Sequence, residues 1–267
     1  MTIKMVAVDM DGTFLNSQQD YDRKRFANIY QEMKEQGIRF VIASGNQYYQ
    51  LKSFFPEIAK ELSFVAENGA YVVSEEKEIF YGEIDPKTVV DVLTILEQFE
   101  DGHTILCGKN SAYVNEKEPA EFIQHGSKYY HRLKKVPDLL EIEEDIIFKF
   151  ALSFPVQQVE IVLEQLHEAL GDKLVPVSSG HGDIDLIISG IHKANGLMQL
   201  QELWGINAEE LATFGDSGND LEMLAHAGHS FAMGNAQPKV KEVAQKTISS
   251  NDEQGVLVTL EQLLQNN

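Results

Sequence analysis

The chain has 267 residues, and its 42 Asp and Glu against 22 Lys and Arg give a formal net charge of −20. A field of this sign repels nucleic acid and anionic membranes, so we expect neither as a partner. The apolar fraction of 43% is sufficient for a full core and a single cysteine excludes an internal disulfide framework, while no apolar run approaches the roughly 20 residues of a membrane span.

The N-terminal part alternates between strand and helix patterns. Apolar runs at 3–8, 39–43 and 64–66 are typical of buried strands, and helical periodicity covers 21–36 and 48–55. Such alternation, with continuous apolar strands, indicates a parallel sheet covered on both faces. The chain begins its first strand without the charged and apolar regions of a signal peptide, so we expect a cytoplasmic protein.

The middle of the chain follows an α+β pattern. Asp85 and Pro86 predict the N-cap and first position of a helix. Further helices are expected from 119 and over 155–171. Short strands are expected at 104–106, 112–114 and 146–154, with a hairpin formed by 174–177 and 184–188. The antiparallel pairs interrupt the alternating pattern, which indicates an inserted domain.

The alternation resumes near the end of the chain, with helices expected at 194–204 and 221–225 and strands at 211–214 and 230–233. We therefore predict an α/β fold, in which a doubly wound, Rossmann-like parallel-sheet core carries an inserted α+β domain. The core is expected to comprise residues 1–82 and 191–267, and the insertion residues 83–190.

Polar clusters follow the ends of the expected core strands, at 9–13, 44–46, 67–69 and 215–220. In open α/β sheets ligands bind outside the carboxyl ends of the strands, so these four loops can meet at one site. Lys193 opens the helix that follows the insertion and can join them.

Asp9 and Asp11 repel each other after a buried strand unless a cation lies near them. Mg²⁺ is usually held by one or two carboxylates together with waters and substrate phosphate, and Asp216 and Asp220 would add carboxylates from the opposite side. Nearby glycines allow backbone N–H groups to approach an anion. One carboxylate can then attack phosphorus, while a second protonates the leaving oxygen and later activates water.

In chain order, the DMDGT segment at 9–13, Ser44-Gly45, Lys193 and the GDSGND segment at 215–220 resemble the four motifs of the haloacid dehalogenase-like (HAD) phosphatases. The long insertion between Ser44 and Lys193 resembles the large cap of their Cof-type branch. Segments 43–51, 65–70 and 192–196 are similar to the bacterial sugar phosphatases of that branch.

The resemblance implies roles for the carboxylates. Asp9 would be the nucleophile and a Mg²⁺ ligand, and Asp11 the general acid/base, with its backbone carbonyl on the metal. Asp216 would be a further metal ligand. Asp220 would hold the water shell of the metal or orient Lys193.

The resemblance also implies which residues hold the phosphoryl group. They would be Ser44, Gly45, Lys193 and Asn219, supported by Gly12 and Thr13. Many Cof-type members have arginine after the Ser/Thr-Gly pair, whereas this chain has Asn46, so the role of that position is open.

Two features of the insertion leave alternatives open. His181, between two glycines, is either a residue that reaches the substrate or an exposed turn residue. Tyr129, Tyr130 and His131 form an aromatic cluster that could stack on a ligand, although core packing is favoured.

We therefore predict a monomeric, Mg²⁺-dependent phosphatase that hydrolyses small phosphorylated metabolites through an aspartyl-phosphate on Asp9, with sugar phosphates favoured as substrates. One alternative is a sugar phosphomutase or phosphotransferase, which passes the group to a second hydroxyl. Another is a phosphatase of nucleotides or of flavin and other cofactor precursors. A binding module with a decayed site would lack one of the four motifs, and all four are present.

Overall fold

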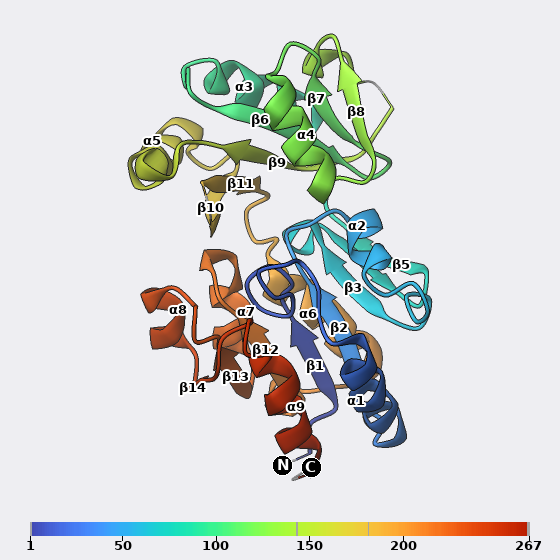
Figure 1. The fold of residues 1–267 in the computed structure, drawn as a ribbon. Helices are drawn as coiled ribbons and strands as arrows, with labels where there is room; N and C mark the ends of the chain where they lie inside the picture. The colour runs from blue at the N-terminus through green and yellow to red at the C-terminus, as the bar shows by residue number, and fades with distance from the viewer. Residues whose placement is uncertain (1, 143, 181, 266–267) are drawn as a thin grey trace.

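The computed structural model describes residues 2–142, 144–180 and 182–265, which form two β-sheets with helices around them (Figure 1). The larger, here called the core sheet, has the strand order β14-β13-β12-β1-β2-β3-β4-β5. Its parallel strands are β1 (Met5–Val8), β2 (Arg39–Ala43), β3 (Ser63–Ala66), β12 (Leu211–Gly215), β13 (His229–Ala232) and β14 (Lys246–Thr247). The central strands are buried on both faces, which is why they read as continuous apolar runs.

One edge of the core sheet is a hairpin of β4 (Tyr71–Ser74) and β5 (Lys77–Tyr81), and β4 pairs antiparallel with β3. This hairpin is not among the strands expected from the sequence. Its turn residues Glu75 and Glu76 have φ of 49° and 64°. Asn and Gly are the usual signal for such a turn, so two glutamates conceal it.

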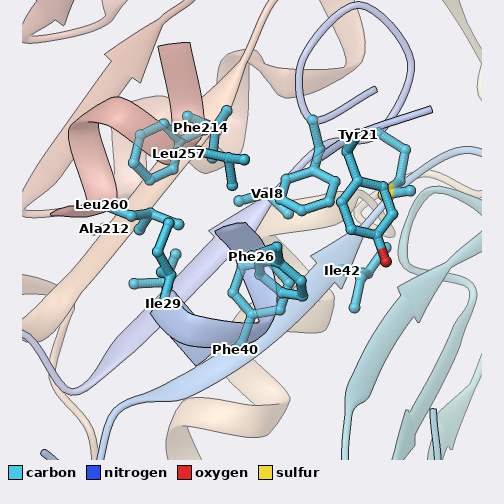
Figure 2. Packing of buried hydrophobic residues seen from close by; sticks show 14 of the residues in the cluster. Val8, Tyr21, Phe26, Ile29, Phe40, Ile42, Ala212, Phe214, Leu257 and Leu260 are labelled. Atoms are coloured by element: carbon cyan, nitrogen blue, oxygen red, sulfur yellow. The ribbon is translucent and has the colours of Figure 1, made fainter. Parts of the chain in front are cut away.

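Helices cover both faces of the core sheet. One face carries α1 (Arg23–Glu35), α2 (Tyr48–Ser53) and α9 (Gly255–Gln265), and the other carries α6 (Lys193–Trp204) and α7 (Leu221–His226). α8 (Pro238–Val243) contacts α7. Figure 2 shows the first of these cores, in which Val8 and Phe214 from adjacent strands meet Phe26 of α1 and Leu257 of α9. Because side chains alternate along a strand, Met5 and Ala7 of β1 pack in the opposite layer.

The smaller sheet, here called the cap sheet, has the strand order β10-β11-β9-β6-β7-β8. Its strands are β6 (His103–Gly108), β7 (Ala112–Asn115), β8 (Leu133–Val136), β9 (Ile147–Ser153), β10 (Val175–Gly180) and β11 (Asp183–Ile187). Neighbouring strands are antiparallel except for β7 and β8. α3 (Pro86–Leu96) and α5 (Val159–Leu170) cover one face, and α4 (Ala120–Tyr129) covers part of the other.

The predicted α/β architecture is confirmed, since the core sheet is parallel apart from its edge hairpin and the cap sheet is formed from the middle of the chain. Asp85 is the predicted N-cap, with its side chain accepting from Thr88 N at 3.0 Å. The ends of the insertion, at residues 83 and 190, stay a prediction. None of the helices in the described part of the chain is long and apolar enough to cross a membrane.

Candidate active site

Asp9 directly follows β1 at the end of the core sheet nearest the cap sheet (Figure 1). Its backbone N–H donates to Phe214 O at 3.1 Å, which continues the pairing of β1 with β12. Its side chain is 7% exposed. The strand pairing therefore fixes a buried carboxylate at the edge where ligands of α/β sheets bind.

Lys193 is the first residue of α6 and is fully buried. His192 caps this helix, because its ring accepts from Asn195 N at 3.2 Å. Lys193 Nζ lies 2.6 Å from Asp9 Oδ1 and 2.7 Å from Asp220 Oδ1. A buried ammonium thus joins two carboxylates that come from opposite ends of the chain.

Asp220 uses both of its carboxylate oxygens inside the protein. Oδ1 accepts from Lys193, and Oδ2 accepts from the backbone N–H groups of Asp216 and Ser217 at 2.9 and 3.0 Å. The contact with Lys193 agrees with the second of the two roles predicted for Asp220, the orientation of that lysine.

Asp216 is positioned by the DMDGT loop. Thr13 Oγ1 donates to Asp216 Oδ1 at 2.9 Å. Gly12 has φ +75°, and a Cβ there would lie 2.6 Å from Asp216 Oδ2. The glycine therefore serves both the turn and the close approach of the carboxylate.

Burial shapes the electrostatics of these groups. It raises the pKa of Asp9 well above its usual value; Lys193 acts against this shift, and Asp220 and Asp216 add to it. The pKa of Asp216 is raised to about 7, first by burial and then by Asp220. Burial alone would lower the pKa of Lys193, but Asp220 and Asp9 together raise it above its usual value, so the ammonium stays charged.

Carboxylate oxygens of Asp9, Asp216 and Asp220 lie within 4.8 Å of one another. A donor set made only of oxygen suits a hard cation such as Mg²⁺. Within the described part of the chain, no hydrogen bond reaches Oδ2 of Asp9 or Oδ2 of Asp216. These two oxygens, rather than those of Asp220, fit the coordination of a metal.

Asp11 lies on the same loop, and Asn46 Nδ2 donates a short hydrogen bond to its Oδ2. The other oxygen, Oδ1, is buried and has no hydrogen-bond partner among the described residues. Asn46, whose role the sequence left open, therefore contacts the predicted general acid/base itself. A carboxyl group with one oxygen held and one available is suited to transfer a proton.

The predicted phosphate-binding residues lie around the same loops. Ser44 Oγ accepts from Asn46 N at 3.1 Å, which leaves its hydroxyl hydrogen to donate. Asn219 Nδ2 donates to Asn68 Oδ1 at 2.9 Å. Gly45 lies against Asn68, since a Cβ there would be 3.1 Å from Asn68 Oδ1. His181 lies outside the described residues.

Four residues without a predicted role belong to this region: Asn46, Asn68, Lys149 and Asp185. Asn68 Nδ2 donates to Asp185 Oδ2 at 2.6 Å, and Lys149 Nζ lies 2.8 Å from Asp185 Oδ1. Lys149 and Asp185 belong to the cap sheet. The signal that could have found Lys149 is a lysine within an otherwise apolar strand, which is uncommon unless the charge has a partner.

Comparison with known proteins places this geometry in a family. Residues 6–260 match the sequence model of the haloacid dehalogenase-like hydrolases. The chain is 53% identical over 264 residues to 5-amino-6-(5-phospho-D-ribitylamino)uracil phosphatase YbjI of Escherichia coli K12, covering 99% of this chain and 97% of that protein. It is 28% identical to YitU of Bacillus subtilis, which is also named a 5-amino-6-(5-phospho-D-ribitylamino)uracil phosphatase, and the match covers 94% of each protein.

Among solved structures, SMU.1108c from Streptococcus mutans UA159 superposes with a TM-score of 0.95 at 34% identity, covering 99% of this chain and 100% of that one. The match extends over the cap sheet as well as the core sheet. The chain therefore belongs to the haloacid dehalogenase-like hydrolases, and within them to the phosphatases.

Proposed function

We propose that this phosphatase hydrolyses small phosphate monoesters in a Mg²⁺-dependent reaction, through an aspartyl-phosphate on Asp9. The observation that carries the proposal is the buried group of Asp9, Lys193 and Asp220, with Asp216 beside it. The ammonium and the carboxylates supply the cation and the oxygen donors that a phosphate site requires in a chain of net charge −20.

Asp9 and Asp216 would hold the Mg²⁺ through side-chain oxygens, and the resemblance adds the backbone carbonyl of Asp11. When bound, the cation offsets the negative charge of the phosphoryl group and of the carboxylates around it. Lys193 supplies a further positive charge, and Ser44 and Asn219 supply neutral donors to the phosphoryl oxygens.

In the first half of the reaction, a carboxylate oxygen of Asp9 bonds to phosphorus as the bond from phosphorus to the ester oxygen breaks. Protonated Asp11 gives its proton to the departing oxygen, and an alcohol is released. In the second half, Asp11 takes a proton from water and the water oxygen bonds to phosphorus. The bond from phosphorus to Asp9 then breaks, which releases inorganic phosphate and restores both aspartates.

Asp9→Asn tests this scheme. The amide has the same shape but is a poor nucleophile, so we expect kcat to fall by about 10³-fold or more while the circular dichroism spectrum is unchanged. Release of inorganic phosphate from p-nitrophenyl phosphate, with Mg²⁺ or with EDTA, is the measurement. The exposed carboxylate of Asp252 provides a matched control, since Asp252→Asn should stay within about twofold of wild type. Retained turnover in Asp9→Asn, or in EDTA, contradicts the proposal.

For the substrate we propose a phosphorylated sugar alcohol that carries an aromatic ring. The names of the relatives from E. coli and B. subtilis both describe a phosphorylated ribityl chain on a uracil. Tyr129 supports this choice. Tyr129 is half-buried, and burial, followed by the charges of Asp11 and Asp183, raises its pKa, so its hydroxyl is within electrostatic range of the predicted general acid/base. Tyr130 is buried in the packing of α4, as favoured from the sequence, and Tyr129 packs against the same cluster while keeping part of its surface exposed.

The substrate is tested by comparing kcat/KM for 5-amino-6-(5-phospho-D-ribitylamino)uracil, ribitol 5-phosphate and glucose 6-phosphate. We expect the ring-bearing ester to be preferred, and Tyr129→Leu to raise its KM by about 5- to 10-fold through lost stacking, with little change for the ring-free esters. Equal kcat/KM for all three esters contradicts this choice of substrate. Conversion of a sugar phosphate into its isomer would instead reveal a phosphomutase.

A further inference from the structure

A hydrogen-bond chain runs from the cap sheet to the loop of Asp216. Lys149 Nζ donates to Asp185 Oδ1 at 2.8 Å, and Asp185 Oδ2 accepts from Asn68 Nδ2 at 2.6 Å. Asn68 Oδ1 then accepts from Asn219 Nδ2 at 2.9 Å. Asn219 Oδ1 accepts in turn from Ser217 Oγ at 2.7 Å. All five side chains are more than nine-tenths buried.

The direction of every bond in this chain is set at its cap end. An ammonium only donates, and the carboxylate paired with it offers acceptors alone. Asn68 must therefore turn its NH₂ group towards Asp185, which leaves its carbonyl oxygen for Asn219. Asn219 must in turn present its NH₂ group to Asn68 and its carbonyl oxygen to Ser217. Burial prevents water from relieving a wrong orientation, so a reversed amide would leave buried groups unpaired.

The turn that carries Asn68 is itself fixed against the phosphate site. Asn68 has φ 56°, in the left-handed region, and its backbone N–H donates to Ser44 O at 3.1 Å. Gly45 lies beside the hydrogen bond of Asn68 to Asp185, because a Cβ at position 45 would be 3.1 Å from one residue and 3.2 Å from the other. The link between the two sheets thus passes directly along the predicted phosphate loop.

We propose that Asp185 is a positioning residue, which acts through Asn68 to keep the NH₂ group of Asn219 available to a phosphoryl oxygen. One hydrogen of this group is used by Asn68, and the other is left for the substrate. The inference rests on the proposed role of Asn219 in binding phosphate. It follows that the phosphate site is complete only while the cap sheet is docked on the core sheet.

The first test is a double-mutant cycle on wild type, Asp185→Asn, Asn219→Ala and their combination. The readouts are kcat/KM for p-nitrophenyl phosphate with Mg²⁺ and the Kd of inorganic phosphate. An amide at position 185 can donate to Asn68, which reverses the direction of the hydrogen bonds and turns the NH₂ group of Asn219 towards Ser217. We therefore expect Asp185→Asn to lower kcat/KM roughly 10- to 100-fold, as for loss of a hydrogen bond to a charged group. Because it acts through Asn219, it should cost no more than about twofold in the Asn219→Ala background.

A contact between the cap and core sheets that is not part of this hydrogen-bond chain provides the control. The buried amide of Gln47 bonds to Arg132 through N–H···Oε1 at 2.9 Å and Nε2–H···O at 3.3 Å. Gln47→Ala removes this one contact between the sheets and leaves every hydrogen bond from Lys149 to Ser217 in place, so its effect on kcat/KM should multiply with that of Asn219→Ala. If the losses of kcat/KM caused by Asp185→Asn and Asn219→Ala also multiply in the double variant, Asp185 only docks the cap, and the inference is wrong.

The second test exchanges the two groups, combining Asp185→Asn with Asn68→Asp. Charge is preserved and every donor again faces an acceptor, so most of the lost kcat/KM should return even if either single variant folds poorly. Absence of rescue overturns the inference. A wild type that neither hydrolyses phosphate esters nor binds inorganic phosphate overturns the proposed function. If the wild type is active but the effects of Asp185→Asn and Asn219→Ala on kcat/KM multiply, only the inference is overturned.

Discussion

Asn46 donates its side-chain amide to Asp11, the residue proposed to carry the proton in both halves of the reaction. The hydrogen bond holds one carboxylate oxygen of Asp11, while the other has no partner among the described residues. A neutral donor can orient the carboxyl group without adding a charge to the site. Asn46 is therefore a positioning residue for Asp11, and its loss should slow chemistry more than it weakens binding.

We expect Asn46→Ala to lower kcat by about 10-fold with less than a threefold change in KM, because general acid–base catalysis depends on the geometry of the acid. Steady-state kinetics with p-nitrophenyl phosphate and Mg²⁺ is the measurement. Asn235→Ala is a matched control, since Asn235 donates its amide to the backbone oxygen of Gly12 on the same loop. Unchanged kcat in Asn46→Ala would show that the contact does not serve the reaction.

The charged residues of the site could be predicted from the sequence, because Asp9 and Asp216 directly follow apolar core strands and Lys193 begins a helix. The roles of Asn46 and Asn68 could not be predicted in this way. An amide both donates and accepts, so its role depends on partners that the fold supplies. The partner of Asn68 in the cap sheet is 117 residues away in sequence. Only the docking of the two sheets determines which way that amide points.

At the scale of an element, the Glu67–Gly69 turn joins β3 to β4 with three consecutive residues at positive φ. Positive φ is costly for Glu67 and Asn68, and it persists only where surrounding contacts fix the turn. Gly69 packs against the residue that precedes Lys193, since a Cβ there would lie 2.3 Å from His192 O. The turn therefore supports both Asn68 and the start of α6.

Gly69→Ala should destabilise the protein by more than about 3 kcal/mol, since it combines a backbone clash with an unfavourable φ of +98°. Gly37→Ala is the control. Its φ is +71°, but nothing lies within 4 Å of the added Cβ, so only the backbone term of about 1 kcal/mol remains. Urea unfolding of the two variants measures the difference. Equal losses would mean that the contact with His192 relaxes without cost.

Elements with strong periodicity were predictable and those fixed by tertiary contacts were not. The helix expected at 194–204 is present as α6, and it ends at Gly205 in the left-handed conformation that glycine adopts readily. By contrast, β8 is a half-exposed edge strand with the sequence LKKV, in which two lysines obscure the alternation. It becomes a strand because β7 lies beside it. The order of strands in both sheets likewise depends on contacts between distant segments.

At the scale of the whole molecule, the core and cap sheets meet at a buried ion pair. Glu67 of the core turn is 2% exposed, and its Oε2 lies 3.7 Å from Nζ of Lys149 in the cap sheet. Burial, opposed by Lys149 and assisted by Asp185, raises the pKa of Glu67 from 4.5 to about 7. An insertion could be recognised in the sequence, but a titrating carboxyl group between the two sheets could not, because its pKa depends on the docked geometry.

This shift links the stability of the protein to pH. Between about pH 4.5 and pH 7 the folded state binds a proton at Glu67 that the unfolded state has released. The free energy of unfolding therefore falls as pH rises through this window, and the loss is complete above the folded pKa. Glu67→Gln removes the titration and keeps the shape, while Lys149 retains Asp185 as its partner.

We expect Glu67→Gln to be more stable relative to wild type at pH 8 than at pH 5, by on the order of 2 kcal/mol. Urea unfolding of both proteins at the two pH values is the measurement, and the comparison cancels the contributions of Asp183 and Asp216, whose raised pKa values act in the same direction. Glu100→Gln, at an exposed carboxylate, should leave the pH dependence unchanged. If Glu67→Gln and wild type lose stability equally between pH 5 and pH 8, Glu67 is already ionised at pH 5 in the folded protein. The ammonium of Lys149 would then outweigh the cost of burying that charge between the two sheets.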